Sequence, residues 1–242
     1  MQKGLMEHNA TQGDERGGEP RHVGVHAAGQ ERGVGNTMAN GTVKLSIIYY
    51  SATGTIQKMA DRLVEAGRQA GADVRLRHVE ELAPMAAISS NDAWLRHYEQ
   101  IKDQPKATAD DVVWADAVLF GTPTRYGNVC SQLKQFIDTL GPQWQQGLLA
   151  DKVYAGFTAS QTTHGGQEST LLTLYNVIIH FGGILVPPGY TDPLKFVDGN
   201  PYGVSHVTGP ENTDPLTEAE YNALDHMARR VVTTAGKLRA GA

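Results

Sequence analysis

Apolar residues follow one another along the chain in two patterns, one typical of strands and the other typical of helices. Residues 45–50 form a short run of β-branched and aromatic side chains, long enough for one buried strand. The next apolar positions recur at the spacing of one face of an amphipathic helix: Ile56, Met59, Ala60, Leu63, Val64 and Gly67. The sequence therefore predicts a buried strand that leads directly into a helix.

The same alternation continues to the end of the chain. Further strands are predicted over 73–79, 116–121, 152–157 and 184–186, and helices over 131–140, 170–182 and 217–232. Capping boxes at Thr108-x-x-Asp111 and Thr217-x-x-Glu220 predict two helix starts. A short helix is expected around 94–101 within the irregular segment 82–107, and 189–215 is expected to be a long loop. Repeated strand–helix alternation predicts an α/β fold, a doubly wound parallel sheet of five strands with helices on both faces.

Composition limits the organisation of the chain and the classes of partner. Residues 1–40 lack apolar periodicity and cannot bury enough surface to offset their ordering entropy, so we predict a disordered leader there and a folded domain over 41–242. The formal net charge of -5 argues against a nucleic-acid partner. No apolar run approaches the roughly 18 residues needed to insert into a membrane. Cys130 is the single cysteine, which excludes an intrachain disulfide and is consistent with a reducing cytoplasm.

The residues between the first strand and the first helix favour an anion. Ser51, Thr53 and Thr55 offer hydroxyl donors, and Gly54 lets the backbone approach a ligand closely. A helix that begins here adds free N–H groups and the positive end of its dipole. The loop lacks the lysine of a Walker loop and suits a lone phosphomonoester such as that of FMN. An ordinary strand–helix turn, with hydroxyls that cap the helix, is the alternative interpretation.

Two later loops have a corresponding place in the predicted sheet. Segments 122–128 and 158–166 each follow a buried strand, as 51–55 does. The carboxyl ends of parallel strands lie at one edge of the sheet, where α/β proteins bind their ligands. Topology therefore predicts that the three loops converge on one site. The sequence offers no set of residues that would form a metal site.

Five motifs make the chain from about 43 to 238 resemble a known family. They are YYS-x-x-G-x-I at 49–56, FGTPTRYGN at 120–128, GGQE at 165–168, HFGGILVP at 180–187 and PYG at 201–203. The family is the WrbA family of NAD(P)H:quinone oxidoreductases (type IV), which are flavodoxin-like FMN enzymes that form homotetramers. The resemblance implies a flavodoxin-like fold, FMN as cofactor, and loops from neighbouring subunits that complete each pocket. Segments 82–107 and 189–215 are our candidates for these subunit contacts.

The resemblance also implies roles for individual residues. The FMN phosphate would be held by Ser51, Ala52, Thr53, Gly54, Thr55 and Ile56. The isoalloxazine ring would be bordered by Pro123, Thr124, Arg125, Tyr126, Gly127 and Asn128, and its pyrimidine edge by Ala159, Ser160, Gln161, Thr162, Thr163, His164 and Gly165. His180 would contact the flavin, Trp144 and Tyr126 would border the substrate, and Thr53 would lie near the nicotinamide. The family often has an aromatic residue at position 53, so a stacking role does not carry over to Thr53.

Arg125 and His180 are the candidate catalytic residues. The Arg125 cation could stabilise negative charge that develops near N1 and O2 of the reduced flavin, and the alternative is a surface salt bridge. His180 could hydrogen-bond a quinone oxygen or donate a proton to it, and the alternative is a residue that caps the end of its helix. Trp144 could be a lid on the pocket, a subunit contact, or both.

The function implied by the resemblance is two-electron reduction of quinones by NADH or NADPH. Hydride would pass to N5 of FMN, the nicotinamide would leave, and a quinone would take its place, which predicts ping-pong kinetics. One alternative is a flavodoxin-like carrier that passes single electrons between protein partners. Another is a binding or scaffolding module that keeps the fold without the chemistry.

Overall fold

The computed structural model describes residues 41–241. Five parallel strands form the centre of this part of the chain. The strands are β1 (Lys44–Tyr49), β2 (Asp73–His78), β3 (Ala117–Pro123), β4 (Val153–Ser160) and β5 (Ile184–Leu185). They lie side by side in the order β2-β1-β3-β4-β5. The predicted doubly wound, five-stranded parallel sheet is confirmed. The predicted leader, residues 1–40, lies outside the described residues.

A sixth short strand, β6 (Val204–Val207), lies within the segment that the sequence analysis expected to be a loop. β5 pairs with the first two residues of β4, and β6 pairs in parallel with 157–160 of the same strand. The two short strands therefore share one edge of β4, and the chain between them leaves the sheet to form α8 (Lys195–Asp198). Four residues are too few to give a recognisable period, which is why the pattern of apolar residues does not reveal β6.

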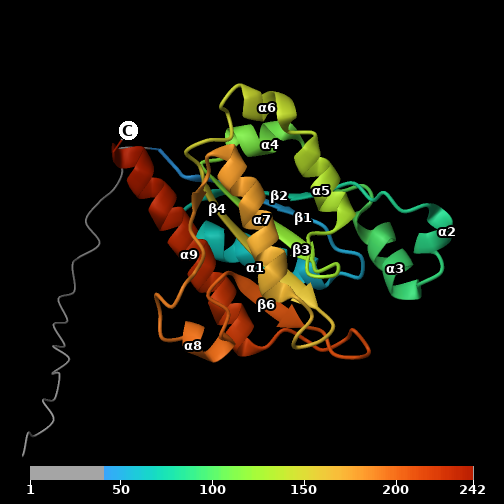
Figure 1. The fold of residues 1–242 in the computed structure, drawn as a ribbon. Helices are drawn as coiled ribbons and strands as arrows, with labels where there is room; N and C mark the ends of the chain where they lie inside the picture. Colours follow the sequence, from blue (N-terminus) through green and yellow to red (C-terminus); the bar gives the residue numbers. More distant parts are fainter. Residues whose placement is uncertain (1–40, 242) are drawn as a thin grey trace, which may run out of the picture. The chain divides into compact units, whose positions relative to one another are not determined.

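Helices cover both faces of the sheet. One face carries α1 (Thr55–Gln69) and α9 (Glu218–Gly241), and the other carries α4 (Ala109–Trp114), α5 (Ser131–Asp138) and α7 (Gln167–Phe181) (Figure 1). Further helices are α2 (Met85–Ile88), α3 (Asp92–Ile101) and α6 (Gly141–Gln145). Within residues 41–241, no helix combines the length and apolarity needed to cross a membrane.

Both predicted capping boxes form, and they fix the starts of α4 and α9. The backbone N–H and the hydroxyl of Thr108 donate to the Asp111 carboxylate at 3.1 and 2.9 Å. The same two groups of Thr217 donate to Glu220 at 2.6 and 2.9 Å. Each box satisfies polar groups that a helix start leaves without an intrahelical partner.

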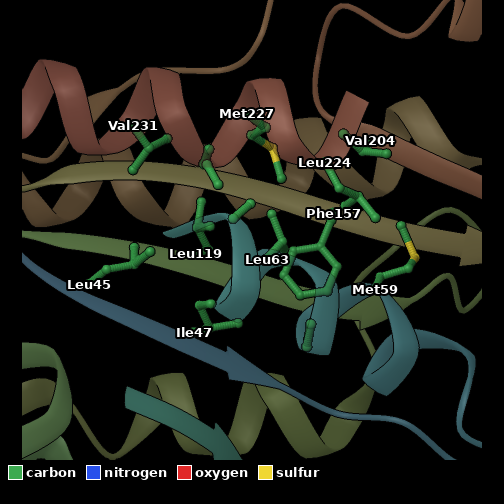
Figure 2. Close-up of a cluster of buried hydrophobic side chains, with 14 of the residues drawn as sticks. Leu45, Ile47, Met59, Leu63, Leu119, Phe157, Val204, Leu224, Met227 and Val231 are labelled. Atoms are coloured by element: carbon green, nitrogen blue, oxygen red, sulfur yellow. The ribbon is translucent and has the colours of Figure 1, made fainter. Parts of the chain in front are cut away.

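Alternate residues of each strand enter two separate hydrophobic cores. From β1, Leu45 and Ile47 face α1 and α9, whereas Ile48 faces the helices of the opposite layer. Figure 2 shows Met59 of α1 and Met227 of α9 in the first of these cores. Each fully buried side chain of this size contributes about 1.5–3 kcal/mol to stability. The packed strands provide a rigid base for the loops at their carboxyl ends.

Candidate active site

A cavity of about 660 Å³ lies at the carboxyl ends of β1, β3 and β4. The structure brings the three predicted loops together around it. The lining residues are Ser51, Ala52, Thr53, Thr55, Ile56, Pro123, Thr124, Arg125, Tyr126, Ala159, Ser160, Gln161, Thr162, Gly165, Thr208 and Asn212. Arg125 is the one charged residue among them, so the lining combines polar and apolar side chains with a single positive charge.

The first loop turns the chain from β1 into α1. Gly54 has φ 99°, a left-handed conformation that glycine adopts without strain, and its N–H donates to the buried Ser51 Oγ at 3.0 Å. This turn directs the start of α1 towards the cavity, where Thr55 and Ile56 line the wall. The first N–H groups of a helix have no intrahelical acceptor, and the dipole adds positive potential there. The wall beside the hydroxyls of Thr53 and Thr55 is therefore suited to an anion.

The second loop is a tight turn that presents an aromatic ring. Arg125 and Asn128 exchange backbone hydrogen bonds of 2.8 and 3.0 Å, and the residues between them, Tyr126 and Gly127, have φ 51° and 74°. Two successive positive φ values define a type I′ turn. Tyrosine seldom adopts this backbone conformation. Here it leaves the Tyr126 ring fully exposed (103%) at the cavity, with its faces free for a planar ligand.

Thr124 links the second loop to the third. Its hydroxyl accepts from the Gly127 N–H (3.2 Å) and from the Thr170 hydroxyl (2.8 Å), and it donates to the Gly165 carbonyl (3.3 Å). A hydroxyl has one proton and two lone pairs, so these three bonds satisfy it completely. The two loops and the start of α7 consequently form one connected unit.

The third loop is held closely against the second. The Gln167 amide donates to the carbonyls of Thr162 and Thr163 at 3.1 and 3.2 Å. A Cβ added at Gly166 would lie 2.8 Å from the Gly127 Cα, so the backbones touch at that point. Thr163 and His164 are exposed and lie outside the lining of the cavity. Close packing therefore fixes the positions of Ser160 to Thr162 along one wall.

A fourth wall comes from the loop after β6, which the sequence analysis did not identify. Thr208 continues β6, and its backbone N–H donates to the Ser160 carbonyl at 2.8 Å. Asn212 reaches across to the first loop, where its amide nitrogen lies 3.3 Å from Thr53 Oγ1. The strand that leads here, β6, is too short to leave a recognisable pattern in the sequence.

Arg125 lies exposed at the cavity, where its guanidinium donates to the Thr124 carbonyl at 3.0 Å. Within residues 41–241, no carboxylate lies within salt-bridge distance of Arg125, so the alternative of a surface salt bridge finds no support. The positive charge is available to a bound group.

Cys130, just beyond the second loop, is buried, unlike the exposed Arg125. Burial raises the pKa of the Cys130 thiol, so the group is protonated at neutral pH. It acts as a small buried residue below the loops. In the described part of the chain, no group of His, Cys, Asp or Glu is arranged to hold a metal ion.

His180 and Trp144 lie together, but away from the cavity. The Trp144 indole N–H donates to the His180 carbonyl at 2.7 Å, and both side chains are exposed. His180 is in the last turn of α7, whose first turn begins at the third loop. At about 1.5 Å per residue, the two ends of α7 are about 20 Å apart. In Figure 1, α6 lies at the top and β6 at the bottom. His180 and Trp144 do not line the cavity.

Comparison with known proteins identifies the family. The family model described as NADPH-dependent FMN reductase matches residues 43–191. A protein of Deinococcus radiodurans named NAD(P)H dehydrogenase (quinone) is 49% identical over 197 residues, which cover 81% of this chain and 97% of the relative. A protein of the same name from Sinorhizobium fredii is 39% identical over 202 residues, with 81% and 98% covered.

Solved structures agree on the fold. The WrbA-like flavodoxin of Agrobacterium tumefaciens superposes with a TM-score of 0.57 at 22% identity, over 81% of this chain and 99% of that one. Flavodoxin 2 of Bacillus cereus gives a TM-score of 0.53 at 16% identity, over 79% and 99%. At these identities the likeness shows the flavodoxin-like fold alone. The family model and the sequence relatives confirm the predicted family of quinone oxidoreductases: the chain belongs to the NADPH-dependent FMN reductase family, with relatives named NAD(P)H dehydrogenase (quinone).

Proposed function

We propose that the chain is a flavoprotein that binds FMN in the cavity and reduces quinones with NADH or NADPH, two electrons at a time. The observation that carries this proposal is the convergence of three loops on one cavity: the hydroxyl-rich start of α1, the Arg125–Asn128 turn and the loop after β4. The family model and the names of the sequence relatives support the same chemistry.

The residues present fit FMN. The cavity volume of about 660 Å³ falls within the range of roughly 300–1,000 Å³ that is usual for cofactor sites. Thr53, Thr55 and the first N–H groups of α1 would hold the phosphate, which needs several donors in the absence of a lysine. The turn at Arg125 to Asn128 would border the ring, and Ser160 to Thr162 would face its pyrimidine edge. Residues 41–242 would make up this FMN-binding domain.

When bound, the flavin supplies the capacity to accept hydride from a nicotinamide and to reduce a quinone. The chain positions planar rings and biases charge. Tyr126 presents an exposed aromatic face at the cavity, which would pack against a ring brought in by either substrate. The unpaired Arg125 guanidinium would stabilise negative charge on the cofactor, which favours the uptake of hydride.

A homotetramer would give His180 and Trp144 a role at the site. Because these residues lie at the end of the subunit far from its own cavity, we propose that they complete the cavity of a neighbouring copy. Large apolar side chains near this end and on the excursion between β5 and β6 are exposed, among them Ile179, Phe196 and Val197. Exposed apolar groups of this kind are typical of subunit contacts. His180 would then hydrogen-bond a quinone oxygen.

The reducing cytoplasm is the location that we propose. Cys130, the one cysteine of the sequence, is a free and buried thiol, so the chain makes no use of disulfide bonds. Proteins that function in oxidising compartments are more often stabilised by disulfides.

Steady-state kinetics test the proposal. If one cavity serves the nicotinamide and the quinone in turn, double-reciprocal plots at several quinone concentrations will give parallel lines. Intersecting lines would mean that both substrates bind at once, and would contradict the use of a single cavity.

A further inference from the structure

The loop from Thr208 to Asp214 is a compact turn anchored to the sheet. Thr208 is 3% exposed, and its backbone N–H donates to the Ser160 carbonyl at 2.8 Å. The Asp214 N–H returns to the Thr208 carbonyl at 3.0 Å and closes the turn. The Gln161 amide also donates to the Pro210 carbonyl at 2.6 Å. The loop is therefore fixed relative to the third wall of the cavity.

Asn212 is held in one orientation within this turn. Its φ is 57°, a left-handed conformation that asparagine tolerates better than most residues. The Thr208 hydroxyl donates to Asn212 Oδ1 at 2.6 Å, and the Asn212 N–H donates to the Gly209 carbonyl at 3.0 Å. With its oxygen engaged in this way, the side chain can point only its NH₂ group away from the loop.

That NH₂ group meets Thr53 of the first loop. Asn212 Nδ2 lies 3.3 Å from Thr53 Oγ1 and donates to it. Both residues line the cavity beside the start of α1. Because Asn212 fills a lone pair of the Thr53 oxygen, the hydroxyl proton is left to be donated elsewhere. Within residues 41–241, no group accepts that proton. Hydrogen bonds in a chain strengthen one another, so the bond from Asn212 makes the Thr53 hydroxyl a better donor.

We propose that Asn212 is a positioning residue that orients the Thr53 hydroxyl as a donor to the phosphate of the cofactor and links two walls of the cavity. This inference rests on the proposed function, because it assumes that the first loop holds the phosphate of FMN. Asn212 acts on that phosphate through Thr53. The loop from Thr208 to Asp214 thereby becomes part of the phosphate site, although it lies more than 150 residues beyond the first loop.

The test compares FMN with riboflavin, which has the same ring but no phosphate. The full chain is freed of flavin, and flavin fluorescence gives the dissociation constants and release rates. Asn212→Gly keeps the left-handed backbone available and removes the amide. Loss of one hydrogen bond predicts an FMN affinity roughly three- to tenfold lower and a faster release of FMN, with riboflavin affinity unchanged. Glu211→Gly, an exposed neighbour outside the lining, is the matched control and should resemble the wild type.

Thr53 supplies a second arm. Thr53→Ser keeps the hydroxyl and should retain FMN affinity, whereas Thr53→Ala should lower it. If Asn212 acts through Thr53, then Asn212→Gly will cause no further loss of FMN affinity in the Thr53→Ala background.

Three outcomes would overturn the inference: unchanged FMN affinity in Asn212→Gly, equal losses for FMN and riboflavin, or additive losses in the double variant. Failure of the wild-type chain to bind FMN would instead overturn the proposed function itself. The two failures are thus distinguishable.

Discussion

The Tyr50 hydroxyl donates to the Glu81 carboxylate at 2.7 Å, at the point where β1 ends and the first loop begins. The same carboxylate accepts from the indole N–H of Trp94 in α3 and from the amide of Gln132 in α5, both at 2.9 Å. The Ala83 N–H adds a further bond of 2.9 Å. One half-buried carboxylate therefore links the end of β1, α3 and the start of α5.

Replacing Glu81 should destabilise the protein. Burial alone raises the pKa of the Glu81 carboxyl, but the hydrogen bonds outweigh it and lower the pKa, so the group is charged at neutral pH. Glu81→Gln directs an NH₂ group at several donors, and we expect a free energy of unfolding lower by about 1–3 kcal/mol in a urea titration. Glu80→Gln is the control, because Glu80 pairs with Lys106 on the exposed surface and should cost less than about 1 kcal/mol. Equal losses would contradict this role for Glu81.

His206 makes stability depend on pH. Its ring nitrogens lie 2.9 Å from Glu220 Oε1 and 2.9 Å from the Asp214 carbonyl. Burial alone lowers the pKa of His206, but the hydrogen bond to Glu220 and the charge of this carboxylate raise it above the usual 6.5. The stabilisation that protonated His206 contributes is therefore complete below pH 6.5, and it is lost as the pH rises through the higher pKa of the folded state.

We expect the urea concentration at the unfolding midpoint of the wild type to decrease as the pH is raised from about 6 to about 9. His206→Gln should remove this part of the fall, since the amide does not titrate over that range. A variant whose midpoint falls as steeply as that of the wild type would contradict the assignment to His206.

Gly166 should tolerate no side chain. Gly166 and Gly71 both have positive φ, 91° and 84°, but an added Cβ meets the Gly127 Cα at 2.8 Å in the first case and nothing within 4 Å in the second. Gly71→Ala therefore measures backbone strain alone, about 1 kcal/mol. Gly166→Ala adds a clash between two backbones, and we expect a further loss of about 1–3 kcal/mol together with weaker FMN binding. Similar unfolding free energies for the two variants would show that the loops separate readily.

Subunit mixing tests the proposed role of His180. Arg125→Ala and His180→Ala should each reduce quinone reductase activity by at least tenfold as homo-oligomers. If His180 completes the cavity of a neighbour, co-expression will produce some cavities with an intact Arg125 and an intact His180. Activity should then recover well above that of a mixture of the separately purified variants. Activity no higher than that of the mixture would place the two residues in the same subunit's site, or show that His180 has no role.

The sequence was sufficient where a pattern is long or a motif is local. The amphipathic spacing from Ile56 to Gly67 and the capping box at Thr217 predicted α1 and the start of α9 correctly. The convergence of the three loops followed from the parallel sheet, because the carboxyl ends of parallel strands share an edge.

Contacts between residues far apart in the chain could not be predicted from the sequence. β6 is four residues long, and it exists because Val204 and His206 find a partner in β4, more than 40 residues earlier. The contact between Asn212 and Thr53 depends on that pairing and leaves no local pattern. The sequence also could not predict that His180 and Trp144 lie away from the cavity. The motifs near these residues do not specify where the end of α7 lies relative to the three loops.

The most direct test of the proposed function is an anaerobic titration of the FMN-loaded protein with NADH, followed by benzoquinone, with the visible flavin spectrum as the readout. Two-electron chemistry predicts that the flavin bleaches directly, without accumulation of a radical, and that benzoquinone restores the oxidised spectrum rapidly. Slow reduction with a stable blue or red radical would contradict that account and would indicate a one-electron carrier.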